Sequence, residues 1–411
     1  MCGTEPSDSA NYLRLIVPAL IAGVSCVGIV DLATFGYAGS AYGFSLLWSL
    51  VLLFFFSFFI LQITAQVGLA TKCGFLSNIK MRYGHFVAVF VAFLISSANV
   101  AIITAEIAGS SSLLSSIVGF SIALWAPLLS LLICVLSVKS YSQTIKNVLV
   151  MTSFIMIVCV PAAILSSPPL GGLVRGFLSV EFHPSRDFML TLMAIIGTQI
   201  SGDSLLFEAS EASKKPKGYG VLTLEFVGMM VGVFMGILVD ASILITCASQ
   251  LYPKGLVIDS VEEAILALKP ALGDVVVYML AFGAVASSFL RSAVAAISNL
   301  KILDELVDDL AEVLRIRAAI LSGWKIILAS VSFLIAPLFL AFGASPLKLV
   351  INASALTCVL SPIPLIFLSL LFTGIRFPED VHAGLVKAFC WFITIIISVI
   401  SVVGLAFTAF G

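Results

Sequence analysis

The stretch QISGDS (Gln199–Ser204) interrupts the apolar run of residues 188–211 with a glycine, a carboxylate and small polar side chains. Glycine weakens a helix by about 1 kcal/mol relative to alanine, and Ser and Asp offer the backbone competing hydrogen bonds. A second interruption of this kind, GIVD (Gly28–Asp31), falls in the run of residues 14–38. Both stretches are therefore predicted places where a helix unwinds.

The composition of the chain is typical of an integral membrane protein. Of its 411 residues, 61% are hydrophobic and 10% are charged, whereas a soluble domain carries roughly 25% charged residues. The missing charge indicates that lipid covers much of the exterior. A net charge of −1 argues against a nucleic-acid partner, because no basic patch is available to neutralise phosphates.

A helix needs about 20 apolar residues to cross the hydrocarbon core, and cutting the chain at charged or Gly/Pro/Ser-rich stretches gives about eleven such runs. The runs are residues 14–38, 45–69, 86–109, 120–138, 147–166, 188–211, 224–248, 274–298, 325–343, 348–372 and 384–409. The predicted fold class is therefore an all-α membrane protein with one transmembrane domain.

The two interrupted helices occupy matching places in this count, since helices 1 and 6 are each the first of a group of five. Interrupted segments at matching positions are the best sequence indication of a transporter built from inverted repeats. We expect a first repeat over residues 14–166, a second over 188–372 and an extra helix over 384–409. The alternative is two glycine-containing kinks whose acids pair with other donors.

The distribution of Lys and Arg among the loops predicts the orientation, because cytoplasmic loops carry the excess. With the N-terminus cytoplasmic, the inner loops contain Lys72, Lys80, Arg82, Lys139, Lys146, Lys214, Lys215, Lys217, Lys301, Arg315, Arg317 and Arg376. The outer loops contain only Arg175, Arg186, Lys254, Lys269 and Lys348. The C-terminus is then outside, and the membrane is expected to be a bacterial inner membrane or a plasma membrane. The inner loop of residues 299–324 is expected to form an amphipathic surface helix.

Ionisable groups deep in a membrane span are costly, so Asp31 and Asp203 mark a functional site. Two carboxylates near the same depth repel each other in a low dielectric. No Lys or Arg is predicted at that depth, because Arg291 lies near the expected cytoplasmic end of helix 8, from where its side chain can reach the interface. A bound cation or a proton is the expected partner.

Three further acids form a candidate proton path. Glu208 and Glu211 are three residues apart and so share a helix face toward the cytoplasm. Glu106 lies near the outer end of helix 3. Interfacial solvation is the alternative for Glu106 and Glu211, and the role of Asp240 in helix 7 is equally open.

At these residues the chain resembles the Nramp family of divalent metal transporters, within the amino acid–polyamine–organocation superfamily. The resemblance covers most of the chain. The similar stretches are residues 31–34 (DLAT), 38–39 (AG), 42–48 (YGFSLLW), 66–74 (QVGLATKCG), 98–101 (ANVA), 105–109 (AEIAG), 196–200 (IGTQI) and 209–211 (ASE). The family fold implies an inverted 5+5 repeat, and the family activity implies a divalent metal cation as transported substrate, with no cofactor.

The signature motifs of the family differ in this chain. Its Asp-Pro-Gly-Asn motif of helix 1 aligns with GIVD (Gly28–Asp31), and its helix 6 motif aligns with SGDS (Ser201–Ser204). A family histidine aligns with Glu208. Asp31 and Asp203 are gained, and the methionine thioether is replaced by Ser201. Oxygen-only ligands favour hard cations such as Mg²⁺ or Mn²⁺. The list of predicted metal ligands is Asp31, Asp203, Ser201, Ser204 and carbonyls near Gly28 and Gln199.

The expected mechanism is alternating access, in which helices 1 and 6 rock against helices 3, 4, 8 and 9, with coupling to protons as a further hypothesis. One alternative keeps the fold but transports an amino acid or an amine. Another is a transport-inactive sensor or scaffold. An enzyme is not expected, because His85, His183 and His382 lie in or beside loops and no GxSxG, HExxH or P-loop pattern occurs.

Overall fold

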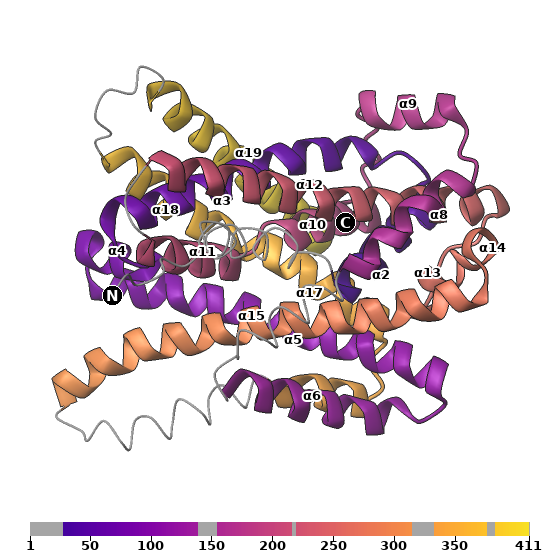
Figure 1. Cartoon of the computed structure of the whole chain (residues 1–411), viewed down its shortest axis with the longest axis horizontal. Helices are drawn as coiled ribbons and strands as arrows, with labels where there is room; N and C mark the ends of the chain where they lie inside the picture. Colours follow the sequence, from indigo (N-terminus) through magenta and orange to yellow (C-terminus); the bar gives the residue numbers. More distant parts are fainter. Residues whose placement is uncertain (1–27, 139–153, 216–218, 315–332, 376–382, 411) are drawn as a thin grey trace, which may run out of the picture.

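A computed structural model of the chain describes residues 28–138, 154–215, 219–314, 333–375 and 383–410, and the regular elements in these ranges are all helices (Figure 1). Several sequence predictions lie outside the described residues: the first half of helix 1 (residues 14–27), parts of the runs 147–166 and 325–343, the cations Lys139, Lys146, Lys217, Arg315, Arg317 and Arg376, and His382.

The elements follow one another with short connections. The first are α2 (Ile29–Tyr42), α3 (Leu47–Thr71), α4 (Phe75–Tyr83), α5 (His85–Val118), α6 (Ile122–Val138), η1 (Phe154–Val158), α8 (Cys159–Leu165) and α9 (Leu170–Leu178). They continue with α10 (Arg186–Gln199), α11 (Gly202–Lys214), α12 (Tyr219–Gln250), η2 (Tyr252–Lys254), α13 (Val261–Leu266), α14 (Lys269–Leu272) and α15 (Asp274–Leu314). The last are a helix over residues 333–341, α17 (Pro346–Leu360), α18 (Pro362–Gly374) and α19 (Ala383–Phe410). Where the runs expected from the sequence are described, they lie mainly in helices, but the runs 188–211 and 348–372 are each divided between two helices. The helices of the runs 86–109 and 274–298 continue to Val118 and Leu314.

Apolar side chains cover the outside of the helix bundle. Within the described part of the chain, 7 helical segments are long and apolar enough to cross a membrane. Three of them join consecutive elements: α10 with α11, α12 with η2, and α17 with α18. The peripheral helix α6 exposes Leu124, Leu128 and Leu131, and α19 exposes Val399 and Val402. Exposing so many apolar side chains to water would be unfavourable, whereas lipid tails are equally apolar and can cover them. The protein is a multi-pass integral membrane protein.

The end of α15 corrects two expectations. Residues 299–314 do not form a separate surface helix after a span ending at 298, because α15 continues without interruption from Asp274 to Leu314. The helix keeps its register through Asn299, whose side chain accepts a hydrogen bond of 2.9 Å from Asn99 of α5. Arg291 therefore lies within the bundle rather than at the end of a span.

Both predicted helix interruptions involve extended backbone. Helix α10 ends at Gln199, Ile200 (φ −117°, ψ 97°) and Ser201 (φ −127°, ψ 148°) are extended, and α11 begins at Gly202. Helix α2 begins at Ile29 after an extended Gly28 (φ −140°, ψ −167°). The break in helix 6 is confirmed, and the part of helix 1 before Gly28 lies outside the described residues.

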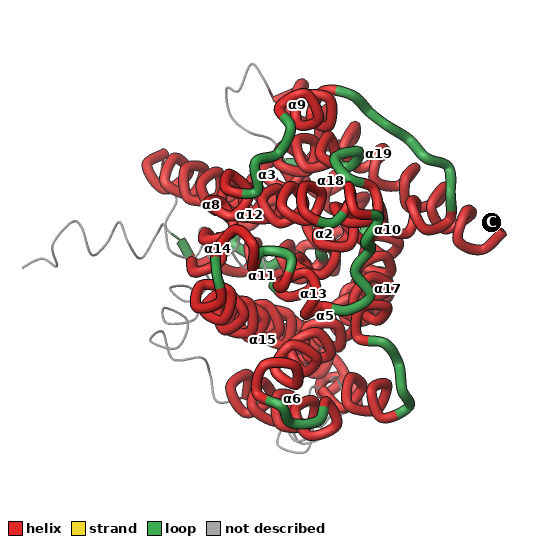
Figure 2. The backbone as a smooth tube through the Cα atoms, turned by 90° about the vertical axis from the view of Figure 1, so that its right-hand side faces the viewer, coloured by secondary structure: helices red, strands yellow, loops and turns green. Residues whose placement is uncertain are grey.

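The starts of α2 and α11 lie inside the bundle. In Figure 2, α3 and α12 lie on one side of α2, and α5 and α15 lie on the other. Helix α10 packs closely on α17, because Gly197 has no side chain: a Cβ there would overlap the backbone carbonyl of Ser354. This packing holds the end of α10, and thus the break that follows it, in the interior.

Candidate functional site

Asp31 is the third residue of α2 and is fully buried. Its Oδ2 accepts a hydrogen bond of 2.7 Å from the backbone N–H of Gly28, at the extended turn before the helix. An acid at this position is favoured because the first N–H groups of a helix lack intrahelical partners and carry partial positive charge. Gly28 and Asp31, both predicted from the sequence as site residues, are therefore joined by a hydrogen bond at the N-terminus of α2.

Glu106 of α5 reaches the same helix start from 77 residues away and is also fully buried. The N–H of Ile29 is shared between Oε2 of Glu106 (3.2 Å) and Oγ of Ser288 (3.1 Å). A Cβ on Gly28 would overlap the Glu106 carboxylate. Glu106 is thus neither interfacial nor solvated, and the glycine makes room for its carboxylate beside Asp31.

A buried arginine completes this cluster, which corrects the expectation that no Lys or Arg lies at this depth. Nη1 of Arg291 lies 2.7 Å from Oδ2 of Asp31, and its Nε lies 3.5 Å from Oε1 of Glu106. Nη2 donates a 2.8 Å hydrogen bond to the carbonyl of Thr198, in the last turn of α10. The side chain is 3% exposed. The error arose from ending helix 8 at residue 298, which placed Arg291 near the interface.

The end of α10 is also tied to α12. Nε2 of Gln199 donates a 2.6 Å hydrogen bond to Oδ2 of Asp240, and Asp240 is fully buried. Asp240 is therefore an interior group rather than an interfacial one. The sequence prediction gave Gln199 the role of offering a backbone carbonyl to a cation. In the structure its side-chain amide also donates a hydrogen bond to Asp240, the third buried acid of the site.

Asp203 lies in a different part of the bundle from Asp31. It is the second residue of α11 and 5% exposed, and its backbone carbonyl accepts a 3.3 Å hydrogen bond from Ser298. Ser298 is seven residues beyond Arg291 on α15, which corresponds to about 10 Å along the helix. Ser201 and Ser204 lie beside the break with their Oγ atoms 3.1 Å apart. No hydrogen bond joins Asp31 to Asp203 among the described residues.

Several carboxylate oxygens in the interior have no hydrogen-bond partner in the part of the chain that the structure describes. They are Oδ1 of Asp31, Oε1 of Glu106, Oδ1 of Asp203, Oδ1 of Asp240, Oε2 of Glu225 and both carboxylate oxygens of Glu208. A buried charged oxygen without a partner is costly unless it meets a cation or a proton. Such oxygens occur both at the start of α2 and at the break between α10 and α11.

The predicted proton path divides into two environments. Glu208 is fully buried, whereas Glu211 is 23% exposed and contacts Lys214 (2.8 Å) and Lys301 (3.6 Å). Glu211 is therefore partly exposed and paired with lysines, as expected if it is simply solvated rather than part of a proton path. Sequence reasoning missed the buried ion pair of Lys215 and Glu225 nearby. An acid near the start of the apolar run 224–248 was the available signal.

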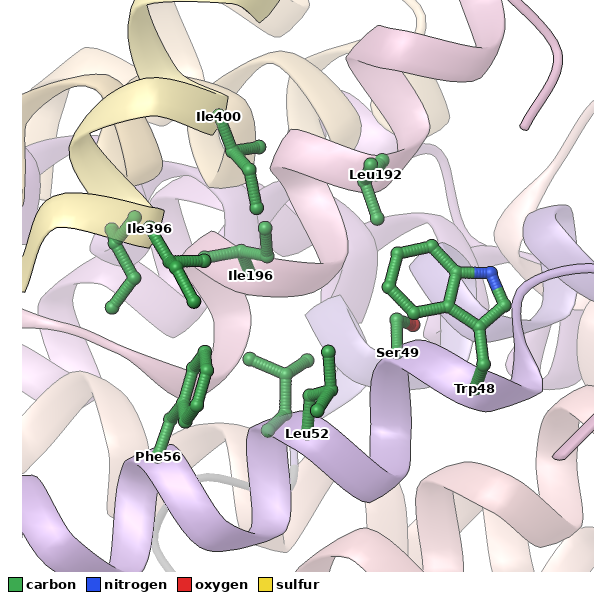
Figure 3. Close-up of a pocket in the computed structure, with 10 residues that line it drawn as sticks. Trp48, Ser49, Leu52, Phe56, Leu192, Ile196, Ile396 and Ile400 are labelled. Atoms are coloured by element: carbon green, nitrogen blue, oxygen red, sulfur yellow. The ribbon is translucent and has the colours of Figure 1, made fainter. Parts of the chain in front are cut away.

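Two pockets differ in character. A small pocket of about 30 Å³ between α3, α10 and α19 is lined by Trp48, Leu52, Phe56, Ile196 and Ile400 and has no charged side chain (Figure 3). A larger pocket of about 380 Å³ lies where α2 ends and α10 and α17 begin. Its polar lining residues are Tyr37, Asp187, Thr191, Asp259, Ser345, Lys348 and Asn352. Of these two pockets, the larger has charged side chains that can attract an ion. No spacing in the sequence indicated it.

Comparisons with known proteins agree with this architecture. The divalent metal cation transporter MntH of Yersinia enterocolitica is 25% identical over 316 residues, which cover 72% of this chain and 74% of that protein. MntH of Bacillus subtilis is 20% identical over 263 residues, 62% of each chain. The crystal structure of the Eremococcus coleocola manganese transporter has a TM-score of 0.76 at 15% identity and covers 99% of this chain and 89% of its own.

A more distant structure shares the fold alone. MhsT in complex with L-phenylalanine has a TM-score of 0.60 at 10% identity, over 96% of this chain and 98% of its own. The family model described as natural resistance-associated macrophage protein-like matches residues 19–407, nearly the whole chain. The protein therefore belongs to the Nramp family of membrane transporters, and it is not an enzyme.

Proposed function

We propose that this protein is a secondary transporter of a hard divalent cation such as Mg²⁺ or Mn²⁺, working by alternating access. The proposed binding site lies at the two helix breaks. Its ligands are Asp31, Asp203, Ser201, Ser204 and backbone carbonyls near Gly28 and Gln199. The relatives named as divalent metal and manganese transporters support the substrate class.

The observation that carries the proposal is the presence of unpartnered carboxylate oxygens at the start of α2 and at the break between α10 and α11. Oδ1 of Asp31 and Oδ1 of Asp203 are buried and accept no hydrogen bond from any described residue. Broken backbone at membrane depth is tolerated where it lines a cavity or is buried in protein, and transporters place their ion sites there. Because the two acids have separate partners, a shared ion requires the two breaks to approach each other during the transport cycle.

The donor set favours a hard cation. Among the described residues, no group of three or more His, Cys, Asp and Glu side chains could hold a metal, so hydroxyl and carbonyl oxygens must complete the coordination. Oxygen ligands suit Mg²⁺ and Mn²⁺ better than soft transition metals. The cluster around α2 has three carboxylates (Asp31, Glu106, Asp240) and one guanidinium (Arg291). With all three acids ionised its net charge is negative, which attracts a cation.

Proton coupling and orientation remain parts of the proposal. Glu208, buried with both carboxylate oxygens unpartnered, is the proposed inner proton carrier, with Glu211 as the exit to water and Glu106 as the outer group. The end of the bundle where Lys72 donates to the carbonyl of Lys215 is the proposed cytoplasmic end. The 380 Å³ pocket at the other end is the proposed outer access. Metal-driven acidification of vesicles tests the coupling, and uptake that ignores every pH gradient would refute it.

Binding to the purified protein tests the site. Titration calorimetry with Mg²⁺ and Mn²⁺ should show binding to the wild-type protein and its loss in Asp203→Asn. Asp274→Asn is the control, because Asp274 has a 64% exposed side chain at the start of α15. Unchanged binding in Asp203→Asn refutes the ligand assignment. Uptake of manganese into proteoliposomes with the same variants connects binding to transport.

A second candidate substrate is a small organic amine. The favouring observation is that the site between Asp31 and the Thr198 carbonyl already accommodates one organic cation, the Arg291 guanidinium. Competition decides between the two: labelled amines or amino acids should fail to enter proteoliposomes if the substrate is a divalent metal. Uptake of an amine that excess Mn²⁺ does not reduce would favour the second candidate.

A further inference from the structure

Arg291 joins three helices where the start of α2 meets the end of α10. Its guanidinium contacts Asp31 at the start of α2 (2.7 Å), the Thr198 carbonyl at the end of α10 (2.8 Å) and Glu106 of α5 (3.5 Å). A carboxylate from one broken helix and a backbone carbonyl from the other are the ligands that a transported cation needs at such a site. The guanidinium therefore occupies a position suited to a cation.

We propose that Arg291 is a tethered cation that neutralises the empty transport site and is displaced when the transported divalent cation binds. The proposal rests on the proposed function and adds a residue that sets the affinity for the substrate. It predicts direct competition: the divalent cation and the guanidinium cannot both use Oδ2 of Asp31 and the Thr198 carbonyl.

The geometry allows the displacement. The contact of Nε with Glu106 is 3.5 Å long, well beyond the 2.7–2.9 Å of a strong charge-assisted bond, so this acid is held only loosely. The arginine side chain is long and flexible, and a divalent ion carries twice its charge. Helix α15 offers further hydroxyl groups next to Arg291, including Ser292, whose Oγ is buried without a hydrogen-bond partner among the described residues.

The return of the guanidinium also gives a reason for the release of the substrate. Buried carboxylates without a cation are costly, so an empty site that left Asp31 uncompensated would raise the free energy of the unloaded transporter. With Arg291 in place, the unloaded transporter can change its orientation without leaving Asp31 uncompensated. The binding of the substrate is weakened by the same competition.

Two substitutions of Arg291 and one control test its role as a tethered cation, called the tether below. For each variant the dissociation constant for Mn²⁺ is measured by titration calorimetry. Arg291→Gln removes the charge and should bind Mn²⁺ at least about tenfold more tightly than the wild-type protein. Arg291→Lys keeps a cation but loses the planar fork that contacts Asp31 and Thr198 together, so it should tighten binding by a smaller factor. Arg175→Gln, which breaks an exposed arginine–glutamate pair, should leave the constant unchanged.

The outcomes separate the tether from the proposed function. Equal or weaker Mn²⁺ binding by monodisperse Arg291→Gln overturns the tether while leaving divalent transport intact. If only the variants bind Mn²⁺, the tether is supported and the divalent substrate of the wild-type protein is refuted. If no protein binds Mn²⁺ or Mg²⁺, both are overturned. Should Arg291→Gln fail to fold, Arg291→Lys decides: tighter binding supports the tether, and equal or weaker binding overturns it.

Discussion

Nε2 of Gln199 donates a hydrogen bond of 2.6 Å to Oδ2 of Asp240, and both side chains are buried. Gln199 is the last residue of α10, and Asp240 lies well inside α12. The end of a broken helix is thereby fixed to a helix that does not break.

Removal of this donor should destabilise the protein. Gln199→Leu leaves the Asp240 carboxylate without its amide partner, and we expect a loss of about 1–3 kcal/mol. Asp240→Asn keeps an oxygen that can accept the bond and should cost less. Thermal unfolding of the purified variants measures both, and equal losses would contradict the role given to the hydrogen bond.

The buried ion pair of Lys215 and Glu225 should matter much more than its exposed neighbour. Lys215 is 8% exposed and Glu225 fully buried, and Glu208 is close enough that loss of the lysine leaves two interior acids uncompensated. We expect Lys215→Met to cost about 3–5 kcal/mol. Lys214→Met is the control, since this 63% exposed side chain pairs with Glu211 near water and should cost about 0–1 kcal/mol. Similar losses of stability in Lys215→Met and Lys214→Met would contradict the conclusion that Lys215 and Glu225 form a buried ion pair.

The close packing of α10 on α17 predicts that Gly197 tolerates no side chain. In Gly197→Ala the Cβ meets the backbone carbonyl of Ser354, which cannot rotate away, so we expect a loss of about 1–3 kcal/mol from overpacking. Gly171→Ala in α9 places its Cβ in open space and should be tolerated. A thermally neutral Gly197→Ala would show that the two helices separate without cost.

The hydrogen bond of Ser45 should give a pH-dependent contribution to stability outside the membrane. Ser45 donates at 2.7 Å to Oε2 of Glu181, and this bond, followed by the charge of Arg175, lowers the pKa of Glu181 below its ordinary 4.5. A lowered pKa stabilises the fold above the ordinary value, and the contribution is lost as the pH falls through the folded-state pKa.

Ser45→Ala should therefore lower the unfolding temperature at neutral pH and have a much smaller effect well below pH 4.5. Ser116→Ala removes a hydroxyl whose one hydrogen bond among the described residues is to the Leu113 carbonyl, so its effect should not vary with pH. An effect of Ser45→Ala that is constant from neutral to acidic pH would contradict the link to Glu181.

Labelling from the two sides of the membrane tests the orientation. Lys80 and Lys254 are exposed at the proposed inner and outer ends of the bundle, so Lys80→Cys and Lys254→Cys should react with a membrane-impermeant thiol reagent from opposite sides. Labelling of the parent protein, which has its own cysteines, is the background. Reaction of Lys80→Cys from outside intact cells would reverse the assignment.

Local chemistry explains which features could be predicted from the sequence. The break at Ile200 and Ser201 follows from the glycine, serine and aspartate in the surrounding residues, whose effects on a helix act within a few positions. The same applies to the long apolar runs.

The partners of the site acids could not be predicted, because they depend on distances in space rather than along the chain. Arg291 and Asp31 are 260 residues apart. The depth of Arg291 follows from the continuation of α15 to Leu314, and an amphipathic segment after an apolar run looks like a loop helix in sequence. The ion pair of Lys215 and Glu225 was missed for a related reason, since Lys215 was assigned to an inner loop and Glu225 to the start of the predicted span 224–248.

The extended pair Ile200 and Ser201 is the single covalent link between α10, which is fixed to α17 and to Asp240, and α11, which packs on α3. The N–H of Ile200 still bonds the carbonyl of Ile196, but the torsions of Ile200 and Ser201 are extended and belong to neither helix. We therefore expect this pair to be the hinge of the proposed transport cycle. In that cycle we expect α11 to move at the proposed cytoplasmic end of the bundle while α10 and its neighbours stay in place.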